Sequence, residues 1–383
     1  MRVLFVINGF YADGNGLSAS ARRTAGTLRE LGVDVRVLSQ ENSNPDGPQP
    51  DYILPGTYIP VFNNLINRQG YSFARADRKI IAKALEWADI VHIEEPFWLQ
   101  VVTCRLAERM EIPCVGTYHL HPENLFSSVH LGRSLFLNSS TMIFWRNTVF
   151  NKCLILQCPT MSVRQRLEKW HFKSELRVIS NGMVVDRGKR TEKTKKKHDI
   201  FTIISTGRYS VEKDQKTLLK AMQYSVHAGE IKIILAGRGP REAFLKRKAE
   251  KLYKKGIIKH PVEFCFCTPE QLKELYLESD LYVHCATVEV EGLGCTEALS
   301  MGLVPVIAKG KLTATSQYAL SGKSLYNARN ARQLASRIDW WFENRDQLNS
   351  LSLRYAKLDL EYNIRNCALE IKKMYQDALG PSS

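Results

Sequence analysis

A βαβ pattern opens the chain and restricts its possible folds more than any other feature of the sequence. Residues 2–8, RVLFVIN, are almost uninterruptedly hydrophobic, as in a parallel strand that is covered on both faces. A glycine-rich loop follows at residues 9–16, and Ser18 is a candidate N-cap for a helix that ends before Gly32. A second strand is expected at residues 33–39. This order of elements predicts an open, mainly parallel α/β sheet.

The same alternation recurs along the rest of the chain. Further strands are expected at residues 90–93, 114–118, 154–158, 201–206, 232–236, 262–265, 281–284 and 304–308, with helices near 215–225, 241–255, 269–278 and 295–301. We therefore predict two doubly wound, Rossmann-like α/β domains at residues 1–180 and 201–355, joined by a basic linker at 181–200. A helix within residues 356–383 is expected to cross back to the first domain. Two such domains should face a central cleft at the carboxyl ends of their strands.

Positive charge is concentrated in the middle of the chain. The 54 lysines and arginines exceed the 39 acidic residues by 15, and residues 151–250 alone carry +13, whereas residues 1–150 sum to zero. The run at residues 187–197 is typical of a solvated linker. This excess of positive charge is compatible with a nucleotide, an anionic membrane or a nucleic acid as a partner. No zinc-finger or RNA-recognition motif is present, so we do not expect nucleic-acid binding.

The cysteines indicate a reducing compartment. All nine are spread singly except Cys265 and Cys267, and no second pair completes a metal-binding spacing, so we expect no metal site. No apolar stretch is long enough to span a membrane, and the N-terminus does not resemble a secretory leader. We expect a cytoplasmic protein, with peripheral attachment to the inner face of the cell membrane as a further possibility.

The segment EVEGLGCTEA at residues 289–298 carries the strongest chemical signal. Two glycines, Gly292 and Gly294, lie on a loop that opens a helix near Cys295, and free amides at a helix start favour a phosphate. The flanking carboxylates, Glu289 and Glu297, would repel a second anion but accept hydrogen bonds from sugar hydroxyls. Together these groups suggest a sugar nucleotide. A helix whose first-turn Glu297 only compensates the dipole would show the same pattern.

A pair of cations follows the first strand of the second domain. Gly207 leaves room for a close approach, and Arg208 and Lys213 can hold a diphosphate and offset the charge that builds on it as a leaving group. Surface cations of a basic protein are the alternative interpretation.

The second half resembles the retaining glycosyltransferases of family four, which have the GT-B fold. The family pattern is present as Gly207-Arg208 with Glu212-Lys213, Gly237-Arg238-Gly239-Pro240, Glu289 with Glu297, and Pro305-Val306. The match extends over about residues 180–310 in order, spacing and strand context. One departure is that the usual Gly-Phe-Gly after the first glutamate is here Val290, Glu291 and Gly292.

The first half is similar to the acceptor domain of the same enzymes. Its loop Gly14-Asn15-Gly16-Leu17-Ser18 matches the glycine loop after the first strand, and Thr117-Tyr118-His119 matches a Thr-x-His at a strand end. The stretch VGTYHLHPEN resembles members of the family that build glycolipids or lipid-linked glycans.

The resemblance implies transfer of a hexose from a nucleotide diphosphate sugar, such as a UDP-hexose, to a lipid or lipid-linked glycan with retention of configuration. Neither a metal nor another cofactor is implied. Catalytic roles would fall to Arg208, Lys213, Glu289 and His119. The donor-binding set would be Gly14, Asn15, Gly16, Gly207, Gly239, Glu291, Gly292, Leu293, Gly294, Cys295 and Glu297. A soluble acceptor, a sugar-nucleotide epimerase and a non-catalytic basic protein are the alternatives.

Two segments of the first half are candidates for membrane contact. A helix-like stretch at residues 68–85 would place Arg75, Lys79 and Lys83 on one face with Arg78 beside them. A second stretch at residues 135–150 is rich in Phe and Trp and is flanked by Arg133. Ordinary amphipathic helices that pack on the sheet would look the same.

Overall fold

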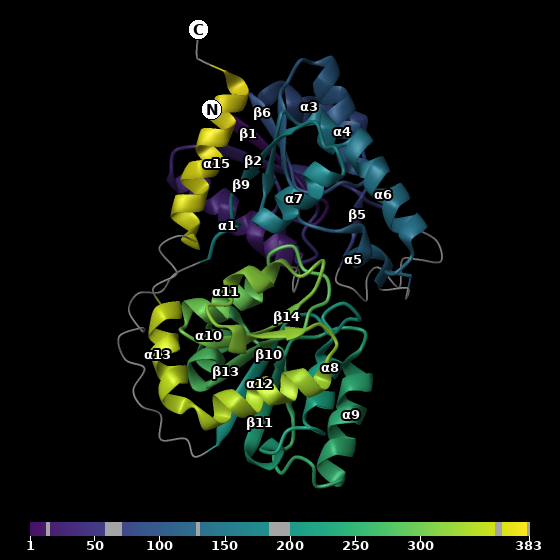
Figure 1. The fold of residues 1–383 in the computed structure, drawn as a ribbon. Coiled ribbons are helices and arrows are strands. Elements are labelled where there is room, and N and C mark those ends of the chain that lie inside the picture. Colours follow the sequence, from purple (N-terminus) through teal and green to yellow (C-terminus); the bar gives the residue numbers. More distant parts are fainter. Residues whose placement is uncertain (13–15, 58–70, 128–130, 184–199, 357–361, 381–383) are drawn as a thin grey trace. The chain divides into compact units, whose positions relative to one another are not determined.

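The computed structural model describes residues 1–12, 16–57, 71–127, 131–183, 200–356 and 362–380, and it divides into two compact units. The N-terminal unit contains Met1–Phe126, Leu131–Gly182 and Tyr362–Ser383, and the C-terminal unit consists mainly of Met183–Glu361. Each unit is built on a parallel sheet with helices packed against it (Figure 1). The doubly wound α/β architecture expected from the sequence is thereby confirmed.

Seven parallel strands form the sheet of the N-terminal unit, in the order β3-β2-β1-β6-β7-β8-β9. Their bounds are Arg2–Val6 (β1), Asp34–Gln40 (β2), Tyr52–Leu54 (β3), Ile90–Ile93 (β6), Cys114–Thr117 (β7), Ile155–Cys158 (β8) and Glu175–Val178 (β9), and Gly56–Thr57 (β4) and Phe73–Ala74 (β5) form a separate antiparallel pair. Val3 of β1 lies opposite Val35 of β2 and Ile90 of β6. Because β1 is central and fully buried from Val3 to Val6, its sequence has to be continuously hydrophobic.

The helices of this unit are α1 (Gly16–Glu30), α3 (Arg78–Trp87), α4 (Trp98–Arg109), α5 (Pro122–Ser127), α6 (Leu135–Thr148), α7 (Met161–Lys169) and α15 (Ile364–Leu379), with the 3-10 turn η1 (Phe150–Lys152). Helix α15 comes from the far end of the chain and packs on α1. Ala368, Ile371 and Tyr375 recur at helical spacing and are buried in one cluster with Ala25 and Phe5. The C-terminal helix is therefore part of the N-terminal core.

Six parallel strands form the sheet of the C-terminal unit, in the order β12-β11-β10-β13-β14-β15. They are Phe201–Thr206 (β10), Ile231–Ala236 (β11), Glu263–Cys265 (β12), Leu281–His284 (β13), Val304–Lys309 (β14) and Leu325–Asn327 (β15). The helices are α8 (Gln215–Ala221), α9 (Glu242–Lys254), α10 (Pro269–Glu278), α11 (Leu293–Ser300), α12 (Ala331–Glu343) and α13 (Arg345–Tyr355), with η3 (Ala228–Glu230), η4 (Ala314–Tyr318) and η5 (Gly322–Ser324). Central β10 is buried along its whole length, as β1 is in the other sheet.

Two helix starts differ from the sequence prediction. Ser18 is not an N-cap: α1 already begins at Gly16, and the Ser18 hydroxyl donates to the carbonyl of Gly9 at 2.6 Å. Helix α3 begins only at Arg78, because the Asp77 carboxylate accepts from the Lys79 amide at 2.9 Å and caps the first turn. Arg75 therefore precedes the helix, and the predicted helical face of Arg75, Lys79 and Lys83 does not exist.

The strands that the sequence did not predict are short and lie at the edges of the sheets. They are β3, β9 and β15, together with the small pair β4 and β5. Edge strands contact one neighbour only and need no continuous hydrophobic run, so their sequences lack the signal used for the central strands. The predicted linker at 181–200 lies mostly outside the described residues.

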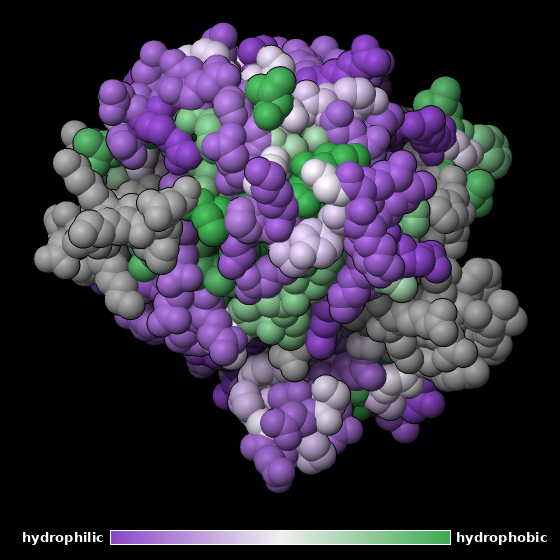
Figure 2. Space-filling view, turned by 90° about the horizontal axis from the view of Figure 1, so that it is seen from below, coloured by the Kyte–Doolittle hydropathy of each residue, from purple (hydrophilic) through white to green (hydrophobic). Residues whose placement is uncertain are grey.

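Most of the surface seen in Figure 2 is hydrophilic, as expected for a chain with a net charge of +15. Among the described residues, no helix is both long enough and apolar enough to cross a bilayer.

Stability of the C-terminal unit should depend on the protonation of His227. Its two ring nitrogens lie 3.2 Å from a carboxylate oxygen of Glu230 and 2.9 Å from one of Glu343, and the ring stacks on Phe342. Burial alone would lower the pKa of His227, but the two carboxylates raise it above its usual value of 6.5. A raised pKa means that the stabilisation is complete below the unfolded-state value and is lost as the pH rises through the folded-state value. Urea unfolding of the wild type should therefore show a loss of stability as the pH rises above about 6.5, the unfolded-state value of histidine.

The variants His227→Gln and Glu343→Gln should each weaken this pH dependence. An unchanged pH profile in both variants would contradict the proposed contribution of the histidine.

Candidate active site

The carboxyl ends of β10 and β13 lie at the switch point of the C-terminal sheet. From β10 the chain builds outward through β11 and β12 on one side, and it returns to β13 on the other side. In open parallel sheets, such a point is where ligands bind. The loops that begin here contain Arg208 and Lys213 after β10 and Glu289 after β13. The structure thus brings three of the four predicted catalytic residues to one edge of one sheet.

An ion pair between Lys213 and Glu289 joins the two loops. The buried ring of His284 lies beside it, with Nε2 3.5 Å from the same Glu289 oxygen. Burial by itself would raise the pKa of Glu289, but the Lys213 ammonium and the His284 ring outweigh it and bring the pKa to about 2. Burial lowers the pKa of His284, so its imidazole is neutral near pH 7. Glu289 is therefore an ionised carboxylate that can accept hydrogen bonds from hydroxyl groups.

Arg208 is held in place by the loop that carries it. Its Nη2 donates to Glu212 Oε1 at 2.7 Å, and the Ser210 hydroxyl donates to the same oxygen at 2.6 Å. The Gln215 side chain donates to the Arg208 carbonyl at 2.9 Å, which fixes the backbone as well. The Thr287 amide donates to the Glu212 carbonyl at 2.7 Å and ties this loop to the one that follows β13. Both cations are thus positioned by protein contacts before any ligand is considered.

Helix α11 begins directly beside this cluster. Gly292 caps it with a φ of 86°, a left-handed conformation that favours glycine. A side chain on Gly294 would begin 2.5 Å from the Thr206 hydroxyl, so this position has no room for one. The Cys295 amide already donates to the Gly292 carbonyl at 2.8 Å, which leaves Leu293 and Gly294 to supply the first amides of the helix. The positive end of the α11 dipole can attract a phosphate at this position.

The remaining predicted donor-site residues of this unit surround the same loops. Gly207 has a φ of 121°, and a side chain on Gly239 would begin 2.6 Å from the Tyr209 carbonyl, so backbone packs directly on backbone here. Glu291 is buried, and Glu297 is half-buried on α11. Burial raises the pKa of the Cys295 thiol, which places this side chain in the core as a neutral group. Leu293 is half-buried at the helix start.

The N-terminal sheet has its own switch point, between β1 and β6. His119 follows β7, and its Nε2 lies 2.6 Å from an oxygen of Glu94, which directly follows β6. The neighbouring Glu95 accepts from the amide and the side chain of Asn8 at 2.7 and 2.6 Å, and from the Tyr71 hydroxyl. Polar groups thus meet at the carboxyl ends of β1, β6 and β7.

Part of the predicted glycine loop is described. Gly16 opens α1, whereas Gly14 and Asn15 lie outside the described residues.

Sequence reasoning missed several groups that complete these sites. Glu94 directly follows a predicted buried strand, and that position alone would have been sufficient to find it. His284 ends β13 in the same way, so its position also carried a signal. Ser210 and Gln215 act only by supporting the Arg208 loop, and no pattern in the sequence indicated this.

Comparison with known families covers nearly the whole chain. Residues 186–357 match the family model described as Glycosyl transferases group 1, and residues 14–187 match the model described as Glycosyltransferase Family 4. The chain is a glycosyltransferase of the GT-B class. The predicted GT-B fold is thereby confirmed, because solved structures of such enzymes align with this glycosyltransferase over essentially its full length.

The individual relatives described next share little sequence identity with this glycosyltransferase. This glycosyltransferase is 25% identical over 328 residues to an alpha-monoglucosyldiacylglycerol synthase of Streptococcus pneumoniae, over 81% of this chain and 71% of that protein. Anabaena HepE in complex with UDP and glucose aligns with a TM-score of 0.73 at 14% identity, over 98% of this chain and 99% of the other. Sucrose-phosphate synthase from Thermosynechococcus elongatus aligns with a TM-score of 0.72 at 14% identity, over the full length of both.

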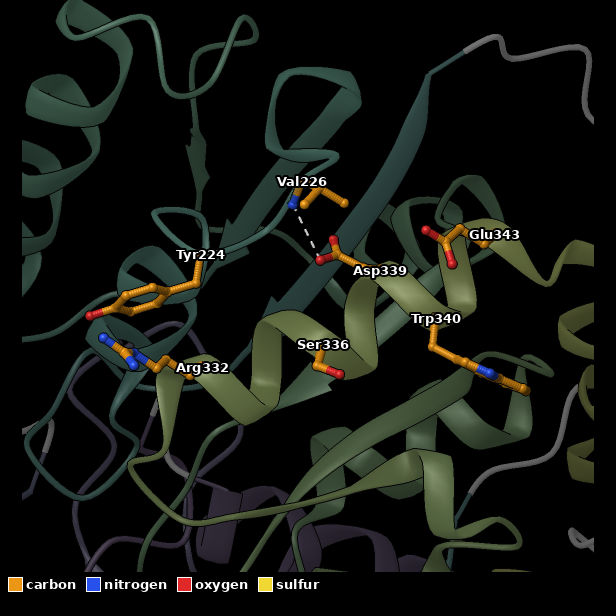
Figure 3. A pocket seen from close by; sticks show the side chains of 7 residues that line it. All are labelled: Tyr224, Val226, Arg332, Ser336, Asp339, Trp340 and Glu343. Atoms are coloured by element: carbon orange, nitrogen blue, oxygen red, sulfur yellow. Dashed lines mark hydrogen bonds between the residues drawn. The ribbon is translucent and has the colours of Figure 1, made fainter.

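A shallow surface pocket of about 560 Å³ lies elsewhere on the C-terminal unit (Figure 3). It is lined from α12 by Arg332, Ser336, Asp339, Trp340 and Glu343, and from the segment after α8 by Tyr224 and Val226. Asp339 points at the backbone of Val226, whose amide it accepts at 3.2 Å, so this carboxylate fixes the loop. None of the predicted site residues lines this pocket, and we assign the chemistry to the switch point instead. In the described part of the chain, no cluster of metal-binding side chains was found.

Replacing Gly292 should test the geometry of the site. In Gly292→Ala, the new methyl group would overlap Thr315 and would lie 3.2 Å from Glu289 Cγ, with a φ that alanine rarely adopts. We expect a loss of about 1–3 kcal/mol in the free energy of unfolding, together with a loss of activity.

Gly310→Ala is a matched control, because its methyl group would meet its nearest neighbour at 3.5 Å. Thermal melts of the two variants should differ, and equal stability would show that Gly292 is not constrained as described.

Proposed function

We propose that this glycosyltransferase moves a hexose from a UDP-linked donor to a lipid acceptor with retention of anomeric configuration. The observation that carries the proposal is the meeting of Arg208, Lys213 and Glu289 with the start of α11 at one switch point. Cations and helix amides suit a diphosphate, and an ionised carboxylate suits sugar hydroxyls. Support for the lipid acceptor is the name of the Streptococcus pneumoniae relative, an alpha-monoglucosyldiacylglycerol synthase.

Each residue of the site has a proposed role. Arg208 and Lys213 hold the diphosphate and stabilise the charge that develops as the bond to the sugar breaks. Glu289 accepts hydrogen bonds from the hexose and Glu297 from the ribose, while the first amides of α11 bind a phosphate. Lys213 can serve both partners, because an ammonium group has three donors and the contact with Glu289 uses one. His119 is proposed to contact the donor sugar, as the family resemblance implies.

The proposed mechanism needs neither a metal nor a dedicated base. If the acceptor attacks from the face on which the phosphate departs, a phosphate oxygen can take the acceptor proton. Neutralisation of the leaving group is assigned to the two cations and to the dipole of α11, the task that a metal ion performs in other phosphoryl sites.

Release of UDP from a panel of UDP-hexoses, with and without diacylglycerol in mixed micelles, tests the function. We expect one UDP-hexose to be consumed, with release of UDP that increases strongly when the lipid is present. Conversion of the donor without release of UDP would indicate an epimerase. Stimulation by a soluble sugar and not by lipid would overturn the proposed acceptor.

Loss of either cation should affect turnover more than folding. Arg208→Ala and Lys213→Ala should each lower turnover by roughly a hundredfold or more, the scale seen when a preorganised electrostatic donor is removed. Lys246→Ala on α9 is a matched control, because Lys246 is exposed and its partner Glu242 lies on the same helix. Turnover within a few-fold of the wild type in both site variants would remove these residues from the mechanism.

A lipid acceptor requires access to a membrane surface, and two helices of the N-terminal unit are proposed to provide it. Arg75, Arg78, Lys79 and Lys83 are all exposed, but the apolar side chains Ile81 and Leu85 of α3 are fully buried. This segment can therefore attract an anionic membrane surface through its cations, but Ile81 and Leu85 are not available for insertion into the bilayer. Helix α6 exposes apolar groups instead: Leu135 is 83% exposed, Phe136 79%, Phe144 47% and Ile143 43%.

Sedimentation with vesicles separates these two contributions. Three or four cations near an anionic surface contribute about 1 kcal/mol each, so changing Arg75, Arg78, Lys79 and Lys83 to Ser should abolish the preference for anionic over neutral vesicles. Changing Phe136 and Phe144 to Ser should weaken binding to both kinds of vesicle. Binding that is indifferent to lipid charge and to both sets of changes would refute membrane docking by these helices.

A further inference from the structure

A network of hydrogen bonds between buried polar side chains extends through the N-terminal unit and ends at His119. The Tyr375 hydroxyl of α15 lies 2.6 Å from Nδ1 of His92, and Nε2 of His92 lies 2.7 Å from the Thr117 hydroxyl. That hydroxyl donates to the Gln157 side chain at 2.8 Å. It must therefore accept from His92, which fixes His92 with its proton on Nε2 and with Nδ1 accepting from Tyr375.

Glu94 lies between the two histidines. One of its oxygens is 2.6 Å from Nε2 of His119, and the other is 3.7 Å from Nε2 of His92. Burial lowers the pKa of His92, and the bonds just described need it neutral. The hydrogen bond between His119 and Glu94 is therefore donated by Nε2 of His119. Burial would raise the pKa of Glu94, but the pKa is lowered overall, and with His92 neutral the hydrogen bond from Nε2 of His119 is the contact that stabilises the ionised carboxylate.

We propose that Glu94 is a positioning residue for His119, holding Nε2 of the ring inward so that Nδ1 is the nitrogen left to meet a ligand. An ionised carboxylate only accepts hydrogen bonds, so the proton of this pair sits on Nε2 of His119. His92 supports the same arrangement from the other side, because it holds Thr117, two residues before His119 on the same strand end. The inference rests on the proposed contact of His119 with the donor sugar.

The adjacent glutamate shows that this assignment is specific to one side chain. Glu95 is as deeply buried as Glu94, but its oxygens accept from Asn8, Gln100 and Tyr71 instead of from a histidine. Two neighbouring carboxylates at one strand end thus have different tasks: Glu95 braces the ends of β1 and β5, and Glu94 faces His119. Glu95→Gln is therefore a matched control for a change at Glu94.

A double-mutant cycle on sugar transfer tests the proposal. Glu94→Gln keeps the shape of the side chain but removes the charge, and we expect kcat to fall on the order of a hundredfold with little change in KM for the donor. His119→Ala should have a similar effect, and the double variant should be no worse than His119→Ala alone. Glu95→Gln should stay within a few-fold of the wild type. Additive losses at Glu94 and His119 would overturn the proposal.

Nitrogen NMR of the His119 ring gives a readout that does not depend on activity. The wild type should show the proton of the neutral ring on Nε2, and Glu94→Gln should shift the ring toward the other tautomer, whereas Glu95→Gln should not. An unchanged ring signal in Glu94→Gln would overturn the positioning role. If His119→Ala retains full activity while the ring signal still responds to Glu94, the proposed sugar contact fails and the positioning stands. Should Glu94→Gln not fold, Glu94→Asp withdraws the carboxylate by about one carbon–carbon bond and permits the same measurements.

Discussion

The central strands of both sheets are covered by protein on both faces, and this burial determines where charge can lie. From Val3 to Val6 in β1 and along β10, no side chain has access to water for an ionised group. A charge placed within such a strand would lose its hydration without compensation. Ionisable groups therefore collect where these strands end, and the crossover connections of a parallel sheet bring several strand ends to the same edge. The location of both polar clusters follows from this constraint.

Two buried carboxylates at these edges, Glu289 and Glu94, are held ionised by specific partners. Glu289 pairs with Lys213, and Glu94 accepts from His119. A further histidine that is neutral lies beside each carboxylate, His284 beside Glu289 and His92 beside Glu94. The two arrangements have the same physical cause, because a buried carboxylate stays charged only where a cation or strong hydrogen-bond donors replace the lost water. The two clusters differ in the positive charge near the carboxylate. Lys213 and Arg208 add positive charge suited to a phosphate, whereas the contacts described around Glu94 come from imidazole rings and not from permanent cations.

Sequence patterns were sufficient to find the central strands and to select residues that lie together at the C-terminal switch point. They were insufficient for most edge strands and for the side chains that support the site. The strand at 281–284 and the helix at 269–278 were predicted with their observed bounds, and in the structure a capping box at Thr268 defines the start of the helix. Glu289 and Lys213 were found from their spacing, but their ion pair was not, because it joins residues that are 76 positions apart. The start of α3 was wrong because a single cap, Asp77, overrides a periodicity that extends further toward the N-terminus. Ser18 was misassigned for a related reason, since its hydroxyl serves a loop carbonyl instead of an amide.

The position of α15 has a consequence for how the protein is made. The N-terminal unit is interrupted by the whole C-terminal unit and is completed only when residues from Tyr362 onward are present. During synthesis, the face of the first sheet that later contacts Ile371 and Met374 stays uncovered while some 180 further residues are added, roughly ten to forty seconds at ribosomal rates. The later half of the chain is contiguous and can fold first. An enzyme of this design thus passes through a nascent state with one finished domain and one exposed apolar sheet, a state that chaperones would recognise and that truncation near the end of the chain would make permanent.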